Sequence, residues 1–306
     1  MAETTRLTLL VMAAGLGSRY GGLKQLDRLG PAGETIMDYA VFDAIRAGFT
    51  RVVFIINPVM ETDFRAMIRA RYQPRVDTAC VLQRLDDLPA GRVVPAGREK
   101  PWGTGQAVFC ARRVVDGPFA VVNADDFYGS GSYRLLADHL AGAGGKTGSE
   151  YAMCGFRLGN TLSEHGAVSR GICRVGADGF LAGITEHARV ARAGSGARSH
   201  LADGQVVNLT GREIVSMNMW AFTPRVFSQL ERLLAAFLAR SGQDPTREFY
   251  IPEAVGTLLA SGTVSVRVLP SDERWFGVTY REDRAAAAAG ISALVASGAY
   301  PTALFP

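Results

Sequence analysis

The stretch that most constrains the fold is "LLVMAAGLGSRYGGLKQLDRLGP", residues 9–31, where an apolar run meets a glycine-rich loop directly. The run at 7–14 is apolar at almost every position, as strands buried on both faces are. Glycines let backbone N–H groups approach an anion closely, and Arg19 and Lys24 add two cations to the same loop. The stretch therefore predicts a buried parallel strand that opens into an anion-binding loop.

Neither standard phosphate motif fits this loop. The glycines from Gly15 to Gly21 are spaced G-x-G-x-x-x-G, and no acidic residue ends the next apolar run at 51–57, so the dinucleotide fingerprint fails. Lys24 comes one residue too late for a P-loop, and no Ser or Thr follows it. What remains is a glycine-rich loop suited to an anion, with Arg19 as a planar donor and Lys24 as a point charge.

The first 150 residues alternate short apolar runs with amphipathic stretches. Three further runs are β-branched and apolar, at 51–57, 77–83 and 118–125. The stretch 35–48 begins with Thr35 and Asp38 in capping-box spacing and ends at Gly48, which predicts a helix, and 104–115 and 131–143 suit two more. This succession predicts an α/β fold with a doubly wound, mostly parallel, Rossmann-like sheet that binds ligands at the carboxyl ends of its strands.

After about residue 150 the pattern changes to alternating segments that predict an antiparallel β elaboration: "YAMCGFRL", "GAVSRGICRV", "FLAGITEH" and "EIVSMNMWAF". Residues 191–205 are small and polar without an apolar period, so we expect a flexible excursion there. The remaining expected elements are helices at 225–240, 252–261 and 281–297 and a strand at 263–269.

Composition excludes several classes of protein. The 306 residues are 48% apolar and 20% charged, with a net charge of +4, which suits a globular protein with small anionic substrates better than one that binds nucleic acid. The four cysteines are widely spaced, which predicts reduced thiols. The first apolar run is too short to span a bilayer, so we expect a cytoplasmic protein without a membrane partner.

The opening pattern resembles that of the sugar-1-phosphate nucleotidylyltransferases, in which a strand is followed by A-G or G-G, x-G-[ST]-R and a nearby lysine. Here the chain reads A-A-G-L-G-S-R and then K-Q-L. The family loop wraps a triphosphate, so the resemblance implies that Arg19 and Lys24 neutralise the β- and γ-phosphates. It assigns the rest of the loop to nucleotide binding: Ala14, Gly15, Gly17 and Ser18. The alternative is a tight turn with two surface cations.

Two further segments resemble the family's nucleotide motifs. "PWGTGQAV" (101–108) is similar to P-x-G-T-x-x-A, which grips base and ribose, with Gly103 and Thr104 matching best. Gln83 matches a glutamine that reads a pyrimidine edge, which implies UTP or dTTP, although a surface glutamine is an equal alternative.

"VVNADDFYG" resembles the family segment V-x-x-G-D-N/D at the end of the central strand. The resemblance implies that Asp125 binds Mg²⁺ between the α-phosphate and the sugar phosphate, and that Arg19, Lys24 and Asp125 carry the catalysis. A carboxylate at a strand's carboxyl end suits a hard cation. The alternative is an Asp-Asp turn that caps the next helix, a role that fits Asp126 better.

Three segments of the second half resemble sugar-binding motifs. "SEHGAV" is similar to E-x-[YH]-G-V and places Gly166 close to the sugar. "ITEH" is similar to E-K-P and places Glu186 on sugar hydroxyls, and "SMNMWAF" is similar to N-x-G-x-Y-x-F and places Asn218 towards the sugar.

Two departures from the family pattern leave questions open. The family's phosphate-binding lysine after the glutamate is His187 here. In "RWFGVTYRED", which resembles W-x-D-x-G-T-x-x-D, Gly277 stands where the second metal-binding aspartate is expected. Asp272 or Asp283 could substitute, or one carboxylate could suffice.

The resemblance thus implies a Mg²⁺-dependent nucleotidylyltransferase that forms an NDP-sugar and pyrophosphate from a nucleoside triphosphate and a sugar 1-phosphate. It implies one domain over 1–306, with a nucleotide half (1–150), a sugar half (151–284) and a C-terminal helical extension (285–306). Two alternatives remain: transfer to a non-sugar phosphate, and a non-catalytic regulator that binds nucleotide sugars. The identity of the sugar and the formation of a homo-oligomer stay open.

Overall fold

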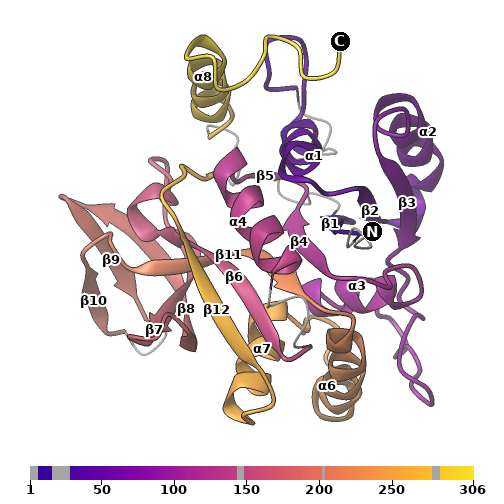
Figure 1. The fold of residues 1–306 in the computed structure, drawn as a ribbon. Coiled ribbons are helices and arrows are strands. Elements are labelled where there is room, and N and C mark those ends of the chain that lie inside the picture. Colours follow the sequence, from indigo (N-terminus) through magenta and orange to yellow (C-terminus); the bar gives the residue numbers. More distant parts are fainter. Residues whose placement is uncertain (1–5, 16–27, 143–147, 202–203, 278–282) are drawn as a thin grey trace.

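A computed structural model describes residues 6–15, 28–142, 148–201, 204–277 and 283–306 and shows a large mixed sheet with helices on both faces (Figure 1). The strands of this sheet are β1 (Thr8–Ala13), β2 (Arg51–Ile56), β3 (Asp77–Leu82), β4 (Phe119–Asn123), β6 (Glu150–Arg157), β7 (Val168–Val175), β8 (Leu181–Ala193), β9 (Gly196–His200), β10 (Val206–Leu209), β11 (Ile214–Phe222) and β12 (Ser265–Ser271). A second, two-stranded sheet pairs β5 (Asp126–Phe127) with β13 (Phe276–Gly277).

The helices are α1 (Ile36–Ala47), α2 (Glu61–Arg71), α3 (Thr104–Cys110), α4 (Ser130–Ala141), α6 (Arg225–Ser241), α7 (Ile251–Ala260) and α8 (Asp283–Ala296). Short 3₁₀ turns span Pro58–Met60, Ala111–Arg113 and Leu158–Asn160.

The sheet combines a parallel half and an antiparallel half. Its main path runs β10-β9-β8-β7-β11-β4-β1-β2-β3, and β6 and β12 attach through β11. Strands β4, β1, β2 and β3 are parallel, whereas β11 runs antiparallel to β4, β6 and β7. The predicted doubly wound, mostly parallel sheet with an antiparallel elaboration is therefore confirmed.

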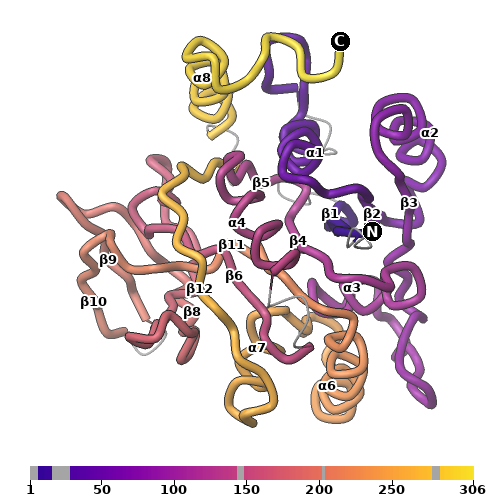
Figure 2. The backbone as a smooth tube through the Cα atoms, viewed as in Figure 1, coloured from indigo at the N-terminus to yellow at the C-terminus, as the bar shows by residue number. Residues whose placement is uncertain are grey.

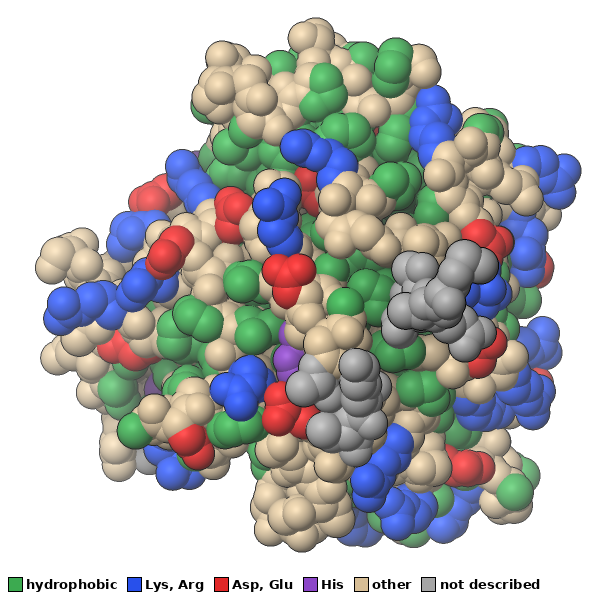
Figure 3. Space-filling model, viewed as in Figure 1, with side chains coloured by type: hydrophobic (Ala, Val, Ile, Leu, Met, Phe, Trp, Pro, Cys, Tyr) green, Lys and Arg blue, Asp and Glu red, His purple; other side chains and the backbone are tan. Residues whose placement is uncertain are grey.

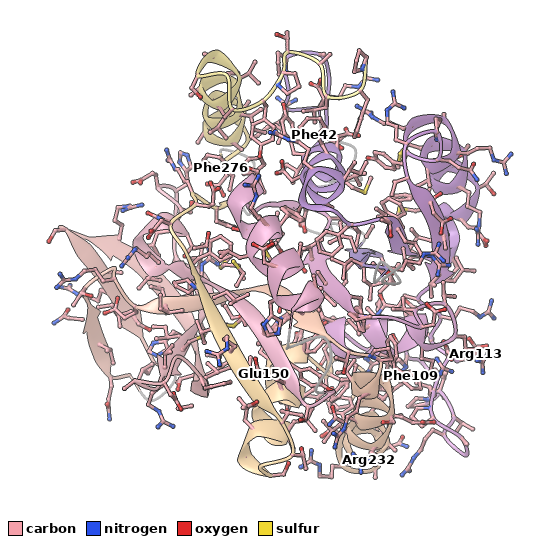
Figure 4. The ribbon with its side chains drawn as sticks, viewed as in Figure 1. Phe42, Phe109, Arg113, Glu150, Arg232 and Phe276 are labelled. Atoms are coloured by element: carbon pink, nitrogen blue, oxygen red, sulfur yellow. The ribbon has the colours of Figure 1, made fainter. Side chains whose placement is uncertain are left out.

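Each face of the sheet has its own apolar core. One core contains residues of α1, α2 and α4, and the other contains residues of α3, α6 and α7. Phe109 of α3, labelled in Figure 4, belongs to the second core. Burial on both faces explains why β1, β2 and β4 are apolar at nearly every position.

Helix α1 follows its sequence signals. The Thr35 side chain accepts from the Asp38 backbone N–H, and the Asp38 carboxylate accepts from the Thr35 backbone N–H at 2.6 Å. Gly48 ends the helix at a φ of 98°, a conformation that glycine adopts without strain. The predicted boundaries of this helix are confirmed within a residue.

The expected flexible excursion at 191–205 is wrong over its first part. Strands β8 and β9 form a hairpin here, with Ala193 paired to Gly196 and Val190 to Ser199. Ala197 and Ser199 are buried while Arg198 and His200 are exposed, so the stretch alternates with a period of two. The alternation escaped notice because its inward side chains are small or polar.

The C-terminal segment returns to α1 (Figure 2). The Tyr300 hydroxyl donates to the buried Asp43 carboxylate at 2.7 Å, and the Leu304 N–H donates to Glu34. Phe42 and Phe276, labelled in Figure 4, pack against the same apolar cluster. The last helix is thereby held over the small sheet of β5 and β13.

Over the face drawn in Figure 3, basic and acidic side chains are interspersed. None of the helices in the described part of the chain has both the length and the apolar character that crossing a membrane requires.

We expect Gly105→Ala to destabilise the protein by about 1 to 3 kcal/mol, because a Cβ there would lie 2.6 Å from a ring carbon of Phe249. The matched control is Gly256→Ala in α7, where a Cβ would have no neighbour within 4 Å and should add up to about 1 kcal/mol of stability. Chemical denaturation of both variants measures the difference. Equal effects of the two substitutions would contradict the packing described for α3.

Candidate functional site

The glycine-rich segment and the acidic segment begin after neighbouring strands, β1 and β4. Met12 of β1 pairs with Asn123 of β4, and the Ala124 N–H donates to the Met12 carbonyl oxygen at 3.1 Å. Gly15 and Asp125 therefore start at the same edge, where the carboxyl ends of parallel strands place ligands.

Ala14 is buried, and its carbonyl oxygen accepts from Asn57 Nδ2 at 3.5 Å. The other loop residues assigned by the sequence lie outside the described part of the chain: Gly17, Ser18, Arg19 and Lys24.

Asp125 and Asp126 have opposite environments. Asp125 is half-buried and makes no hydrogen bond or ion pair with any other residue that the structure describes. Asp126 is 8% exposed, and its carboxylate accepts from Asn123 Nδ2 at 2.8 Å and from the Tyr128 hydroxyl at 3.1 Å. Burial and the neighbouring Asp125 charge raise the pKa of Asp126 above its ordinary range. Asp126 is thus held within the turn after β4, and Asp125 takes no part in these hydrogen bonds.

The donor set around Asp125 suits a Mg²⁺ that is held largely by a substrate. No cluster of three His, Cys, Asp or Glu side chains that could hold a metal occurs in the described residues. Mg²⁺ commonly binds proteins through one or two carboxylates and takes phosphate oxygens for the rest. Asp125, whose oxygens are not used by other described residues, fits this mode.

Neither candidate for a second metal carboxylate lies free at this edge. Gly277 pairs with Asp126 across the small sheet. The Asp272 side chain is 85% exposed and forms an ion pair with Arg157 at 2.8 Å. Asp283 is buried at the start of α8 and accepts from the Ser163 hydroxyl at 2.8 Å.

The three base-side residues come together beside α3. Gln83 Nε2 donates to the Gly103 carbonyl oxygen at 3.1 Å, and the Thr104 hydroxyl accepts from the Ile251 N–H at 3.1 Å. Gly103 has a φ of 96°, and a Cβ there would lie 2.8 Å from the Phe249 carbonyl oxygen. Only glycine allows this approach, so the motif glycine fixes the packing of α3 against the start of α7.

Glu186 stands in a row of three residues across neighbouring strands. Gly171 of β7 pairs with Glu186 of β8 on one side and with Ser216 of β11 on the other. Directly paired residues point to the same face of a sheet. A Cβ on Gly171 would lie 3.5 Å from Glu186 Oε2, so the carboxylate lies close over β7. The Glu186 carboxylate and the Ser216 hydroxyl therefore flank Gly171, which has no side chain of its own.

This row lies on the sheet face that α3, α6 and α7 cover. Ile184 and Cys173, which pair with each other two residues along from the row, belong to the core of that face. Partial desolvation raises the pKa of Glu186, and the Arg170 charge opposes the shift.

Strand β11 changes partner at Asn218. Before it, Ser216 pairs with β7, and after it Trp220 pairs with Val121 of β4 on the same edge. The register with β6 also shifts between Ser216 and Trp220. Asn218 has a φ of 58°, the only non-glycine in the described residues with a positive φ, and its buried Oδ1 has no hydrogen-bond partner among them. Asn218 thus joins the two halves of the site and offers a free acceptor.

Tyr128 fastens this junction. Its hydroxyl oxygen accepts from the Asn123 N–H at 3.1 Å, and its one O–H lies between two acceptors, the Asp126 carboxylate and the Met217 carbonyl oxygen at 2.9 Å. One side chain therefore ties the end of β4 to the irregular part of β11.

His187 follows Glu186 in β8 and so points to the other face of the sheet, whereas Gly166 lies two residues before β7 and its place near a sugar stays a prediction. His187 is 8% exposed, and its Nδ1 lies 2.8 Å from the Ser199 hydroxyl. Across from it stands Arg170, which is 7% exposed and whose pKa burial lowers to about 10. The buried cation of this region is Arg170.

Sequence reasoning missed Gly171 and Ser216. Counting from the turn at 176–180 places Gly171 opposite Thr185, and only the register shift between Arg174 and Val175 brings it opposite Glu186. When "SMNMWAF" is aligned with N-x-G-x-Y-x-F, Ser216 takes the place of the motif's asparagine and Asn218 takes the place of its glycine. The positive φ of Asn218 explains why it can stand at the motif's glycine position, because asparagine adopts a positive φ more readily than most other non-glycine residues.

The chain belongs to the nucleotidyl transferase family: the family model described as "Nucleotidyl transferase" matches residues 9–276. No curated protein matches the chain.

Two solved structures share the fold. One is the inositol-1-phosphate CTP transferase from T. maritima, with 13% identity and a TM-score of 0.61 over 95% of this chain and 97% of that one. The other is a UDP-glucose pyrophosphorylase complexed with UDP-glucose, with 14% identity and a TM-score of 0.57 over 94% of this chain and 99% of that one. At these identities the likeness concerns the fold alone.

The conformation of Asn218 leads to a stability prediction. We expect Asn218→Gly to keep or raise the free energy of unfolding and Asn218→Ala to lower it by about 1 to 2 kcal/mol, because alanine is strained at positive φ. The control pair is at Asn208 of β10, where φ is not positive and glycine should be the worse replacement. Denaturant titration of the four variants tests this. The same ranking at both positions would contradict the strained junction.

Proposed function

We propose that the protein transfers a nucleotidyl group from a nucleoside triphosphate, UTP or dTTP by preference, to a sugar 1-phosphate with Mg²⁺, yielding an NDP-sugar and pyrophosphate in the cytoplasm. The observation that carries the sugar part is the row of Glu186, Gly171 and Ser216, which continues to the unpaired amide oxygen of Asn218. Sugar hydroxyls can donate to the carboxylate and to that amide oxygen.

The proposed nucleotide site occupies the carboxyl edge of the parallel strands. Gln83 and Gly103 would hold the base, Thr104 would lie beside the ribose, and the segment from Ala14 and Gly15 through Gly17 and Ser18 would wrap the phosphates. Arg19 and Lys24 belong to the same loop and would face the β- and γ-phosphates. Asp125, which leaves the sheet next to Gly15, would bind Mg²⁺, which when present neutralises phosphate charge.

In the proposed reaction an oxygen of the sugar phosphate attacks the α-phosphorus in line. A bond forms between that oxygen and the α-phosphorus, and the bond from the α-phosphorus to the bridging oxygen of the β-phosphate breaks, so that pyrophosphate leaves. Such transfers depend on positioning and charge neutralisation and need no covalent enzyme intermediate. Glu186 and Asn218 would orient the acceptor, and Arg19 and Lys24 would stabilise the leaving pyrophosphate.

The experiment that tests this function is a matrix of five triphosphates against acceptor phosphates, scored by pyrophosphate release. We expect release with UTP or dTTP and at least one sugar 1-phosphate. The acceptors include inositol 1-phosphate, because one fold neighbour acts on it with CTP. Release only with a non-sugar phosphate favours the first alternative. Tight binding of an NDP-sugar without any release favours a non-catalytic regulator.

Removing either charge that we assign to catalysis should collapse turnover. We expect Asp125→Ala and Lys24→Ala each to lower kcat by about 10² to 10³, equivalent to ~2.7 to 4 kcal/mol, while the fold is kept. The matched controls are Asp138→Ala on the exposed side of α4 and Lys100→Ala, which removes a surface ion pair. Steady-state pyrophosphate assays compare the four variants. A kcat near that of the unmodified protein for Asp125→Ala and Lys24→Ala would refute their roles.

We expect Glu186→Ala to weaken the binding of the acceptor sugar phosphate and to leave the binding of the nucleotide unchanged. We expect the KM for the sugar 1-phosphate to rise about tenfold or more, with the KM for the triphosphate unchanged, because charge-assisted hydrogen bonds to the sugar are lost. Glu164→Ala serves as the control, since Glu164 is exposed and pairs with Arg192. A rise in the triphosphate KM alone would place Glu186 elsewhere in the site.

A further inference from the structure

Gln106 is a completely buried glutamine whose amide orientation is fixed by backbone carbonyls. It lies in α3 and is 0% exposed. Its Nε2 donates to the Arg84 carbonyl oxygen at 2.9 Å and to the Asp87 carbonyl oxygen at 3.2 Å. Carbonyl oxygens only accept, so the nitrogen of the amide must face them. The Gln106 oxygen is left pointing the other way, towards Gln83.

This fixed oxygen determines the orientation of Gln83. Gln83 Nε2 lies 2.9 Å from Gln106 Oε1 and 3.1 Å from the Gly103 carbonyl oxygen. Both neighbours are acceptors, so both hydrogens of the Gln83 amide nitrogen are used. A flipped amide would set oxygen against two oxygens. Gln83 therefore has no donor left and offers its Oε1 as an acceptor only.

An acceptor distinguishes the two kinds of pyrimidine. Uracil and thymine carry a hydrogen on N3, which can donate to Gln83 Oε1. Cytosine has a bare N3 at the same place, which would set acceptor against acceptor. An unflipped glutamine cannot relieve this clash, although a free glutamine could turn its amide to suit either base.

We propose that Gln106 is a specificity-determining positioning residue, which locks Gln83 as an acceptor and so selects uracil or thymine nucleotides over cytosine nucleotides. The proposal rests on the base site of the proposed function. It adds that the selectivity is set by a buried side chain that never touches the nucleotide.

The test compares the affinities for UTP, dTTP and CTP by titration calorimetry with Mg²⁺ and without an acceptor. We expect the unmodified protein to bind UTP or dTTP at least about tenfold more tightly than CTP. The reason is that the hydrogen bond from N3–H of uracil or thymine to Gln83 is replaced by repulsion between two acceptors when cytosine binds. Gln106→Met removes the oxygen that holds Gln83, and we expect the preference to fall by about tenfold, mainly through tighter CTP binding.

Two further variants keep the test decisive. In Gln106→Glu, the buried carboxyl group can donate its O–H to a backbone carbonyl and keep its other oxygen towards Gln83, so the preference should be retained. Gln83→Met removes the acceptor itself and should abolish the preference even if Gln106→Met does not fold. The matched control is Gln229→Met in α6, another buried glutamine, whose oxygen accepts from the Tyr151 hydroxyl far along the chain.

The outcomes separate this inference from the proposed function. An unchanged UTP-to-CTP ratio in Gln106→Met and Gln83→Met, or a preference for CTP in the unmodified protein, overturns the role of Gln106. If the preference responds to the variants as expected but no sugar phosphate supports pyrophosphate release from a triphosphate, only the proposed reaction is overturned. Failure to bind any pyrimidine nucleotide overturns both.

Discussion

The structure depends on one break in strand pairing. Up to Ser216, β11 lies beside β7, and from Trp220 it lies beside β4, so a single strand belongs to both halves of the sheet. The change of partner needs an irregular backbone, and Asn218 supplies it at a φ of 58°. Tyr128 then fastens the break to the end of β4. The distance between the parallel half and the antiparallel half of the sheet is thereby set by the protein's own core.

The two adjacent carboxylates, Asp125 and Asp126, have different environments. Asp126 is buried, hydrogen-bonded to Asn123 and Tyr128, and partly relieved of its charge, so it holds the turn after β4 together. Asp125 is half-buried and shares none of these hydrogen bonds. A pair of identical residues can serve two purposes because burial and hydrogen bonding differ between consecutive positions.

The sequence predicted most of the fold because its signals are local. Buried parallel strands show continuous apolar runs, and helix α1 shows a capping box and a C-terminal glycine, so both were found with small boundary errors. Strand β9 was missed because its buried residues are Ala197 and Ser199, which carry little hydrophobic signal. Of the candidate site, Glu186 and Asn218 were predicted by motif, and their contact with a sugar stays a prediction. Gly171 and Gln106 were not predicted, because a cross-strand neighbour and a buried amide acquire meaning only from tertiary pairing.

The most direct test is a crystal structure of the full chain with Mg²⁺ and a UDP-sugar. The account predicts a sugar ring over Gly171, with hydroxyls within hydrogen-bonding distance of Glu186 and the Asn218 amide oxygen, and a diphosphate beside Asp125. A sugar bound on the opposite face, beside Arg170 and His187, would contradict it.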